Sequence, residues 1–237
     1  MNELLRELYK KHKYKTELHA HTSGASACAS LTPEEVVRLY AAEGYSSLAF
    51  TNHFDFGLIK NEEILISTLE KHLSDFEKGK KQGEKLGVHV IFATELRFPG
   101  DINDFLFYGP GPDFYRSLEI CKTRTLEDFV KNYKSEDSLL IQAHPFRDGI
   151  TLAPIELIDG VEVFNLHSSH NGRVGIAAKY AEENFLRGTC GTDFHHTFNG
   201  QACGLCTEEK IVCASDIVKA IKSGVNVWKI GSATVLM

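Results

Sequence analysis

Histidines and carboxylates in this chain gather in short clusters that could bind metal ions. The clusters are Glu17-Leu18-His19-Ala20-His21, Asn52-His53, Thr94-Glu95, Ala143-His144-Pro145 and Thr192-Asp193-Phe194-His195. Imidazole together with carboxylate is the ligand set typical of zinc, manganese or iron, whereas magnesium and calcium prefer oxygen alone. The candidate ligands are therefore His19, His21, His53, Glu95, His144, Asp193 and His195.

The spacing within two of these clusters has a physical meaning. In extended backbone, residues i and i+2 point to the same side, so His19 and His21 can face one pocket, and so can Asp193 and His195. One carboxylate such as Glu95 can bridge two ions, and two ions close together stabilise the attacking and leaving oxygens of a phosphoryl displacement. A single HxH pair is a weak signal. The prediction rests on the agreement of several clusters.

The clusters follow short, mostly apolar runs that are typical of buried parallel strands. The runs are residues 14–18, 47–51, 88–94, 105–108, 139–143, 161–164 and 188–192. In parallel α/β folds, ligands collect at the carboxyl ends of the strands, which is where these clusters lie. The run 161–164 is followed by Asn165 and His167, and only the run that ends at Tyr108 offers no residue of this kind at its end.

Amphipathic segments with capping signals alternate with the apolar runs. Thr32-Pro33-Glu34-Glu35 is a capping box with proline at the first helical position, and the helix it starts is expected to stop at Gly44. Further helices are expected over residues 61–86, 125–133, 173–185 and 214–223. Seven strands with interleaved helices favour a closed or nearly closed α/β barrel, with a doubly wound open sheet as the alternative. No Gly-rich phosphate loop follows the first run, which disfavours a nucleotide-binding fold.

Composition excludes several classes of protein. Hydrophobic residues make up 43% and charged residues 24% of 237 residues, an ordinary balance for one globular domain over 1–237. A net charge of -6 argues against an extended nucleic-acid surface. No signal peptide or transmembrane helix is expected, because no apolar run is long enough. Six irregularly spaced cysteines are expected to be reduced thiols in a cytoplasmic protein.

Other polar residues near the predicted ligands could act on a substrate. His167, His170 and His196 are candidate general acids, because imidazole titrates near neutral pH. The sequence does not rank them, and exposed loop residues are the alternative interpretation. The CxxC spacing of Cys203 and Cys206 lacks the second ligand pair of a structural zinc site and the fold context of a redox motif, so no function is expected there.

Three further residues could hold a phosphorylated substrate. Arg97 and Arg147 follow Glu95 and His144 closely, and a guanidinium group matches phosphate oxygens in a bidentate geometry. Asn165, at the end of another run, could form a hydrogen bond to a substrate. Solvated surface arginines, and packing of Asn165 at a strand end, are the alternatives.

The combined motifs resemble those of the PHP (polymerase and histidinol phosphatase) family over nearly the whole chain. The matching segments are Glu-Leu-His-Ala-His-Thr at 17–22, Thr-Asn-His at 51–53, Glu95, Ala-His-Pro at 143–145 and Gly-Thr-Asp-Phe-His at 191–195. The resemblance implies a distorted seven-stranded (β/α)7 barrel, similar to a TIM barrel, that binds two or three divalent ions. It assigns His19, His21, Glu95 and Asp193 to a first ion, and Glu95 and His144 to a second. His53 and His195 would hold a third ion, and Glu17 would orient a histidine.

This chain departs from the family pattern at three places. Asn52 stands where an aspartate is usual, and no histidine follows the fourth run. A further histidine after the first motif is also absent. Cys28 could replace it, because thiolate binds zinc well, but a small buried thiol is the favoured interpretation.

The predicted function is hydrolysis of a small phosphorylated substrate by a metal-bound hydroxide at a site of two or three ions. Two alternatives remain open. One is an amidohydrolase-type enzyme acting on C–N bonds, and the other is a non-catalytic metal-binding module. The natural substrate, the identity of the metals and the oligomeric state are not predicted.

Overall fold

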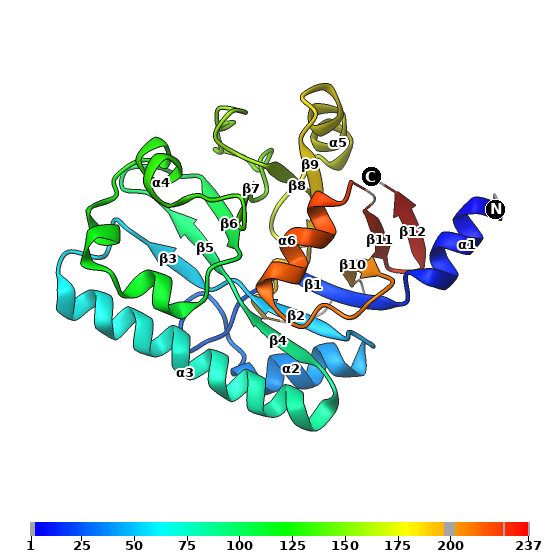
Figure 1. Cartoon of the computed structure of the whole chain (residues 1–237), viewed down its shortest axis with the longest axis horizontal. Coiled ribbons are helices and arrows are strands. Elements are labelled where there is room, and N and C mark those ends of the chain that lie inside the picture. The colour runs from blue at the N-terminus through cyan, green and yellow to red at the C-terminus, as the bar shows by residue number, and fades with distance from the viewer. Residues whose placement is uncertain (1–2, 197–201, 225, 237) are drawn as a thin grey trace.

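The chain folds into two six-stranded sheets with helices packed around them (Figure 1). The structure is a computed structural model, and it describes residues 3–196, 202–224 and 226–236. The sheets have the strand orders β12-β11-β10-β1-β2-β4 and β3-β5-β6-β7-β8-β9. The predicted mixed α/β class is therefore correct. Over the described ranges, no helix combines the length and apolar character needed to cross a membrane.

The first sheet contains three strands predicted from the sequence and three that were not. Its strands are β1 (Tyr14–Ala20), β2 (Ser47–Phe50), β4 (His89–Phe92), β10 (Cys203–Thr207), β11 (Val227–Ile230) and β12 (Ala233–Leu236). β1, β2 and β4 are parallel, whereas β10 is antiparallel to β1, and β11 and β12 continue the antiparallel pattern outward. Burial of β1 between β2 and β10 holds its histidines in a fixed register.

The second sheet contains the other predicted strands together with β3, which was not predicted. They are β3 (His53–Asp55), β5 (Thr94–Arg97), β6 (Asp104–Tyr108), β7 (Leu139–Gln142), β8 (Gly160–Asn165) and β9 (Arg187–Gly191). The predicted run 88–94 is thus divided between β4 and β5, which lie in different sheets. A parallel bridge between Ala20 and Phe194 links the end of β1 to the segment after β9, so the two sheets also meet there.

The direction of β6 differs from the sequence-based expectation. The run 105–108 was expected to be a parallel strand, but β6 is antiparallel to both β5 and β7. Its first residue, Asp104, therefore pairs with Arg97 at the end of β5, and its carbonyl accepts a hydrogen bond from the N–H of Ala143 just after β7. The reversal places the beginning of β6, not its end, at the edge where the candidate ligands lie.

Apart from the first helix, Glu3–Lys11, which was not predicted, the helices begin and end close to the predicted residues. They are α1 (Glu3–Lys11), α2 (Pro33–Ala42), α3 (Glu62–Leu86), α4 (Leu126–Tyr133), α5 (Val174–Glu183) and α6 (Ala214–Lys222), with 3-10 turns at Pro112–Arg116 and Leu118–Lys122. Thr32 and Glu35 form the predicted capping box of α2. α3 ends at Gly87, whose φ of 73° lies in the left-handed region that glycine adopts easily.

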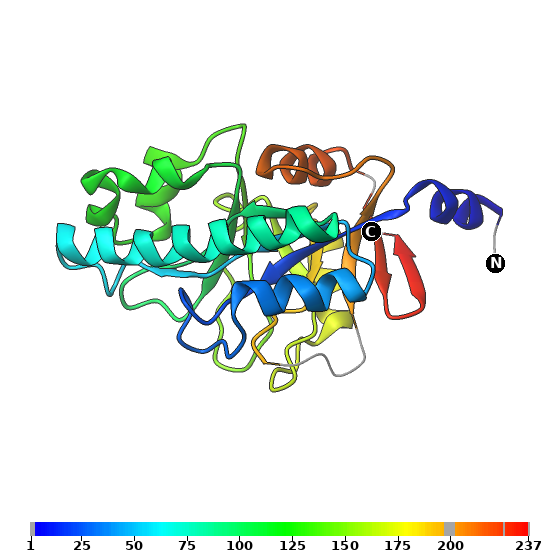
Figure 2. The ribbon, with the colours of Figure 1, turned by 90° about the horizontal axis from the view of Figure 1, so that it is seen from below.

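Two apolar clusters hold the helices against the sheets. The larger cluster contains an aromatic group contributed by β3, β5, β6, α4 and the segments next to them: Phe54, Phe56, Phe98, Phe105, Phe107 and Phe129. The smaller one packs Val36, Val37 and Tyr40 of α2 onto Leu48 and Phe50 of β2. α2 and α3 lie side by side over this part of the molecule (Figure 2). With the apolar faces buried in this way, the polar strand ends remain together at one edge.

Candidate metal centre

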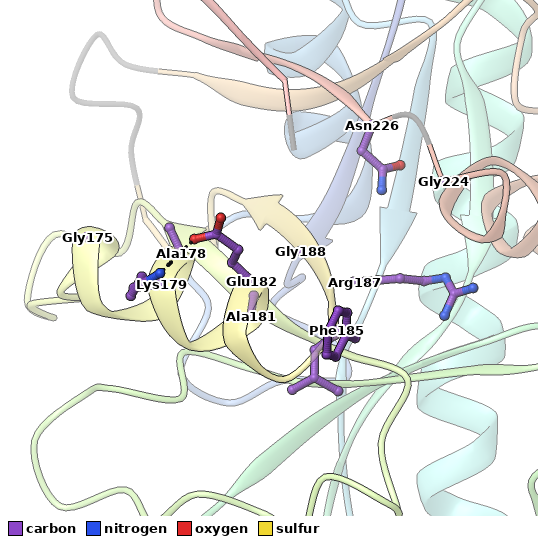
Figure 3. Close-up of a pocket in the computed structure, with 11 residues that line it drawn as sticks. Gly175, Ala178, Lys179, Ala181, Glu182, Phe185, Arg187, Gly188, Gly224 and Asn226 are labelled. Carbon is purple, nitrogen blue, oxygen red and sulfur yellow. Dashed lines mark hydrogen bonds and ion pairs between the residues drawn. The ribbon is translucent and has the colours of Figure 1, made fainter.

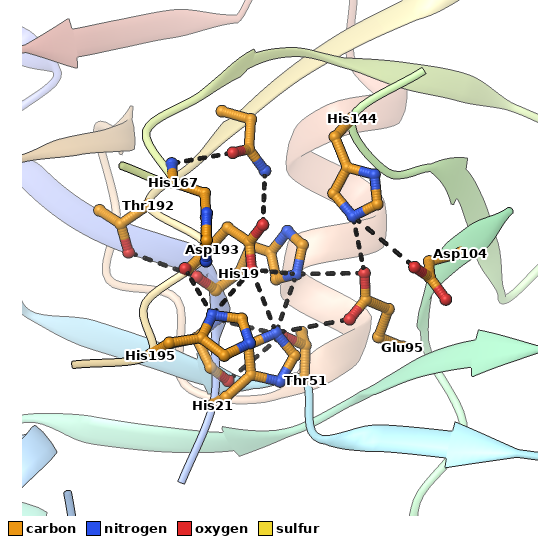
Figure 4. Close-up of polar contacts among 12 residues, drawn as sticks. His19, His21, Thr51, Glu95, Asp104, His144, His167, Thr192, Asp193 and His195 are labelled. Carbon is orange, nitrogen blue, oxygen red and sulfur yellow. Dashed lines mark hydrogen bonds and ion pairs between the residues drawn. The ribbon is translucent and has the colours of Figure 1, made fainter. Parts of the chain in front are cut away.

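The carboxylate of Glu95 lies in the middle of four histidine rings, of which Figure 4 labels those of His19, His21 and His144. Its Oε1 is 3.4 Å from Nε2 of His19 and 3.3 Å from Nε2 of His144. Its Oε2 is 3.4 Å from Nε2 of His21 and 2.8 Å from Nδ1 of His53. Both oxygens are buried, yet neither accepts a hydrogen bond of good geometry from a described residue. A buried carboxylate in this state needs a cation, so the position fits divalent ions on either side of Glu95.

Asp193 completes the group from the opposite side. Its Oδ1 lies 3.5 Å from Nε2 of His19, 3.4 Å from Nε2 of His21 and 3.3 Å from Nδ1 of His195. The Nε2 atoms of His19 and His21 are themselves only 3.1 Å apart. Four groups of side chains have ligand atoms within 4.8 Å of one another: His19, His21 and Glu95; His21, His53 and His195; His53, Glu95 and Asp104; His167, Asp193 and His195. All seven predicted ligands are therefore brought together.

Local backbone geometry sets the direction of these side chains. His19 and His21 alternate with buried Leu18 and Ala20 along β1, as extended backbone requires. His144 and Asp193 have φ values of 32° and 49°, a region that non-glycine residues seldom adopt. Such conformations are found preferentially at functional sites, where the surrounding structure compensates for the strain.

The first glycine of the Gly-Thr-Asp-Phe-His motif is required by close packing. A Cβ atom on Gly191 would lie 2.4 Å from Cβ of His19 and 2.6 Å from Oε1 of Glu162. Any larger residue would push β1 away from β9 and displace the ring of His19.

Glu162 is a functional residue that the sequence analysis did not identify. Its Oε1 accepts a hydrogen bond from Nδ1 of His19 at 2.9 Å, and its Oε2 accepts one from the backbone N–H of His144 at 3.0 Å. Asn165 donates one amide hydrogen to Oε2 of Glu162 and the other to Oδ2 of Asp193. Both amide hydrogens of Asn165 are therefore used in holding the carboxylates. A charged residue in the middle of the apolar strand Gly160–Asn165 was the available signal.

Asp104 is the second residue that was missed. Its Oδ2 lies 3.8 Å from Nε2 of His144. Arg97, expected to bind substrate, instead forms a bidentate pair with Asp104, with distances of 2.7 and 2.6 Å. Burial and the nearby carboxylate of Glu95 raise the pKa of Asp104, and Arg97 opposes this effect. Asp104 escaped the sequence analysis because β6 was assigned the wrong direction.

The charged groups of this site shift one another's pKa values. Burial alone would lower the pKa of His19, but the carboxylates of Glu162, Asp193 and Glu95 outweigh it, and the pKa lies well above its ordinary value. Burial would raise the pKa of Glu95, but His53 and His19 hold it well below its usual range. Burial and the neighbouring His53 lower the pKa of His21 to about 3, which keeps that ring neutral. A neutral imidazole is the form that binds metal ions.

Glu17 has a different role from the one expected. Its Oε1 accepts hydrogen bonds from the backbone N–H groups of Leu18, His19 and Thr192, so it ties β1 to the end of β9. The carboxylate on the ring of His19 is that of Glu162, not Glu17. Burial raises the pKa of Glu17 to about 7.

The candidate general acids lie on the outer side of Asp193. The rings of His167 and His170 are stacked, with centroids 3.9 Å apart, and Nδ1 of His170 is 3.8 Å from Oδ2 of Asp193. Burial and the charge of His167 lower the pKa of His170 to about 4. His196 is exposed, with its ring centroid 6.1 Å from that of His195. His167 and His170 are thus closer to the ligand group than His196 is.

Arg147 is placed differently from Arg97. It is half-buried, and its guanidinium makes no hydrogen bond or ion pair within the part of the chain that the structure describes. Its charge contributes to the lowered pKa of His170. Arg147 is therefore a cation near the rim of the group that remains available for an anionic ligand.

Cys28 corrects another expectation. A small buried thiol was favoured, but Cys28 is exposed. Burial of part of the side chain would raise its pKa, but the rings of His195 and His53 outweigh this and lower the pKa to about 6. Cys28, His53 and Arg97 also line one cavity of about 460 Å³ next to the histidine group.

Two features elsewhere in the chain are separate from this site. A cavity of about 750 Å³ lies between α5 and the start of β9, lined by Phe185, Arg187 and Asn226 among others, and none of the predicted site residues lines it (Figure 3). Cys203 and Cys206 are free thiols on β10, and their odd separation directs them to opposite faces of the strand. They therefore cannot share one ion.

Comparisons with known proteins find solved structures with a similar fold. No protein-family model matches the sequence, and a comparison with curated proteins finds no match. The structure is similar to the crystal structure of a two-domain protein from Bacteroides vulgatus ATCC 8482 that contains a predicted PHP-like metal-dependent phosphoesterase. The TM-score is 0.63 at 16% identity, over 91% of this chain and 64% of that one. It is also similar to an amidohydrolase from Chromobacterium violaceum with bound sulfate and no metal, with a TM-score of 0.50 at 15% identity over 87% and 96% of the two chains.

These similarities define the class of fold. The predicted resemblance to the PHP family is confirmed at the level of the fold. The chain spans less than two thirds of the length of the Bacteroides protein. At such low identity the similarity supports the architecture, and the reaction has to be argued from the side chains of this chain.

Proposed function

We propose that this protein is a metal-dependent phosphoesterase acting on a small phosphorylated substrate. The observation that carries the proposal is the buried Glu95 carboxylate, which faces four imidazoles and accepts no hydrogen bond of good geometry from a described residue. Ions held on both sides of one carboxylate lie close together, which is the arrangement that phosphoryl displacement uses. We further propose a single domain over residues 1–237 and a cytoplasmic location.

We also propose that the strands form a distorted seven-stranded barrel. The seven strands of the barrel would be β1, β2 continued by β3, β4 continued by β5, and then β6, β7, β8 and β9. The bridge between Ala20 and Phe194, which joins the first and last of these, supports closure. β10, β11 and β12 would then extend the sheet outside the barrel.

The ligands divide among two or three ions of zinc, manganese or iron. His19, His21, Glu95 and Asp193 would hold the first, and Glu95 with His144 and Asp104 the second. His53 and His195, with His21 near both, would hold a third. When bound, such ions lower the pKa of a coordinated water and withdraw charge from the phosphoryl oxygens.

The chain's own residues supply the remaining requirements. Glu162 fixes the ring of His19 through Nδ1, so that Nε2 faces the centre. Arg147 is the cation available to bind a phosphate oxygen, because Arg97 is paired with Asp104. His167, next to Asp193 and His195, is the candidate to protonate the leaving oxygen.

The test is an activity panel on the purified protein with manganese, zinc or iron added separately. We expect hydrolysis of p-nitrophenyl phosphate or bis(p-nitrophenyl) phosphate that depends on the metal and is lost in Glu95→Gln. Turnover of p-nitroanilides or N-acyl amino acids without phosphoesterase activity would support an amidohydrolase instead. Tight metal binding with no turnover on either panel would show a non-catalytic metal-binding module.

A further inference from the structure

The loop over residues 22–30, between β1 and α2, lies next to His53 and His195. Hydrogen bonds of Ser26 and Ser30 hold it in place. Ser26 donates from Oγ to Oδ1 of Asn52 at 2.9 Å and accepts the backbone N–H of His53 at 3.1 Å. Ser30 donates its backbone N–H to the carbonyl oxygen of His195 at 2.8 Å. One attachment therefore lies beside His53 and the other beside His195.

Cys28 lies midway between these two attachments. Its side chain interacts with the rings of both His53 and His195. It also lines the same cavity as His53, so a ligand can reach it from solvent. The rings of His53, His195 and the neighbouring His21 already bring three nitrogen atoms within 4.8 Å of one another. The thiol is not a member of that group of three, but it lies at its exposed side, where it interacts with two of the three rings.

Additional contacts show that the loop is built to hold this position. Asp75 of α3 accepts hydrogen bonds from Oγ1 of Thr22 at 2.6 Å and from the N–H of Ala25 at 2.9 Å. Gly24 packs so closely on Asp75 that a Cβ atom would lie 2.2 Å from its carboxylate. Asn52 accepts the N–H of Thr22 at 2.8 Å as well as the hydroxyl of Ser26. The amide at position 52 therefore supports the loop that carries Cys28.

We propose that Cys28 is a thiolate ligand for the divalent ion held by His53 and His195. This inference rests on the proposed metal centre. On binding, the thiol proton is released to solvent and a sulfur–metal bond forms. A mixed thiolate and imidazole ligand set favours zinc, cobalt(II) or iron over magnesium and manganese at this position. Of the three proposed ion positions, this one would then have a softer ligand set than the other two.

Cobalt(II) substitution tests the proposal directly, because thiolate ligation gives cobalt an intense charge-transfer band in the near ultraviolet. The full chain, freed of metal and titrated with cobalt, is compared with Cys28→Ser and Cys28→His. Cys213→Ser is the matched control, since Cys213 is the other exposed cysteine described and caps α6 away from the site. Circular dichroism verifies folding of each variant.

We expect the band in the parent and in Cys213→Ser and its loss in both Cys28 variants. Cys28→Ser should bind about one ion fewer per chain, whereas Cys28→His should regain that ion without the band. Cobalt binding by the parent with no thiolate band, or a band that persists in Cys28→Ser, would overturn the assignment of Cys28 and leave the metal centre intact. A parent that binds no cobalt, zinc or manganese would overturn the metal centre itself.

Discussion

Nδ1 of His19 donates to the Glu162 carboxylate at 2.9 Å, while Nε2 of the same ring lies 3.4 Å from Glu95 and 3.5 Å from Asp193. Both nitrogens of the ring are thus committed, one to a buried carboxylate behind it and the other to the centre of the site. This contact fixes the tautomer and the orientation of the ring. Glu162 also accepts the backbone N–H of His144, so a single carboxylate positions candidate ligands from two strands.

Glu162→Gln should therefore weaken metal binding without unfolding the protein. An amide in place of the carboxylate makes the ring of His19 less basic and no longer selects one tautomer. Loss of such a partner lowers metal affinity or activity by about 10- to 100-fold. Metal affinity measured by competition with a chelator checks this, with the exposed Glu156→Gln as control. Equal affinities for the two variants would mean that Glu162 does not position His19.

Glu95→Gln should have a larger effect than Glu162→Gln. Glu95 faces His19 and His144 through one oxygen and His21 and His53 through the other, so its charge serves two ions. The loss of activity should exceed the roughly 100-fold limit expected for an outer partner. Metal content by elemental analysis and kcat/KM on the best substrate are the measurements. A variant that retains full metal content and activity would show that Glu95 does not bridge ions.

Asp104→Asn tests the residue that the reversed strand β6 brings to the site. If Asp104 helps His144 to hold the second ion, its neutral analogue should lose about one ion per chain and part of the activity. Asp113, on the surface and paired with Arg116, provides the control Asp113→Asn. Unchanged metal content in Asp104→Asn would mean that Asp104 serves only to pair with Arg97.

The sequence predicted that the candidate ligands lie together, because their positions depend on local rules. Alternation along β1 directs His19 and His21 to one side, and strand ends in parallel sheets meet at one edge. Asp104 and Glu162 were missed for different reasons. Asp104 was missed because strand direction is set by long-range pairing, so nothing in the local sequence indicates that β6 is reversed. Glu162 was missed because it lies inside a strand whose apolar pattern predicts only core residues.

The exposure of Cys28 was also beyond sequence reasoning. Its position depends on the contacts of Ser26 with Asn52 and of Ser30 with His195, which join segments far apart in the chain. The helices after α1, by contrast, were predicted to within a few residues, because signals such as the cap at Thr32 and the stop at Gly87 act locally.

Glu17→Gln should change how stability depends on pH. Burial raises the pKa of Glu17 in the folded protein to about 7 from an ordinary value of 4.5. The folded state therefore holds this proton more tightly than the unfolded state does. The stabilising contribution is complete below about pH 4.5, declines as the pH rises, and is lost above about pH 7, a difference of roughly 3 kcal/mol.

Glutamine keeps an acceptor for the three backbone N–H groups but cannot ionise. The free energy of unfolding of the variant relative to the parent should accordingly rise between about pH 5 and about pH 8. Urea denaturation of both proteins across this range is the measurement. A difference between the two proteins that stays constant with pH would show that Glu17 is not the group responsible.

Arg147→Ala should weaken catalysis while leaving the metals in place. The guanidinium has no ion-pair partner among the described residues, and it lies close enough to His170 to lower the pKa of that ring. If it binds a phosphate oxygen, the contact strengthens as charge shifts during bond cleavage, so kcat should fall and KM should rise. A charge-assisted hydrogen bond of roughly 1.5–3 kcal/mol corresponds to about 10- to 100-fold in kcat/KM.

Arg147→Lys should restore only part of the loss, because a point charge cannot reproduce the bidentate fork of a guanidinium. Arg116→Ala, on an exposed 3-10 turn, controls for general effects of removing a surface arginine. Metal content should equal that of the parent in all three variants, since neither arginine contacts a candidate ligand. If Arg147→Ala matches Arg116→Ala in kcat/KM on a phosphorylated substrate, Arg147 does not bind the phosphate, and other groups hold the substrate.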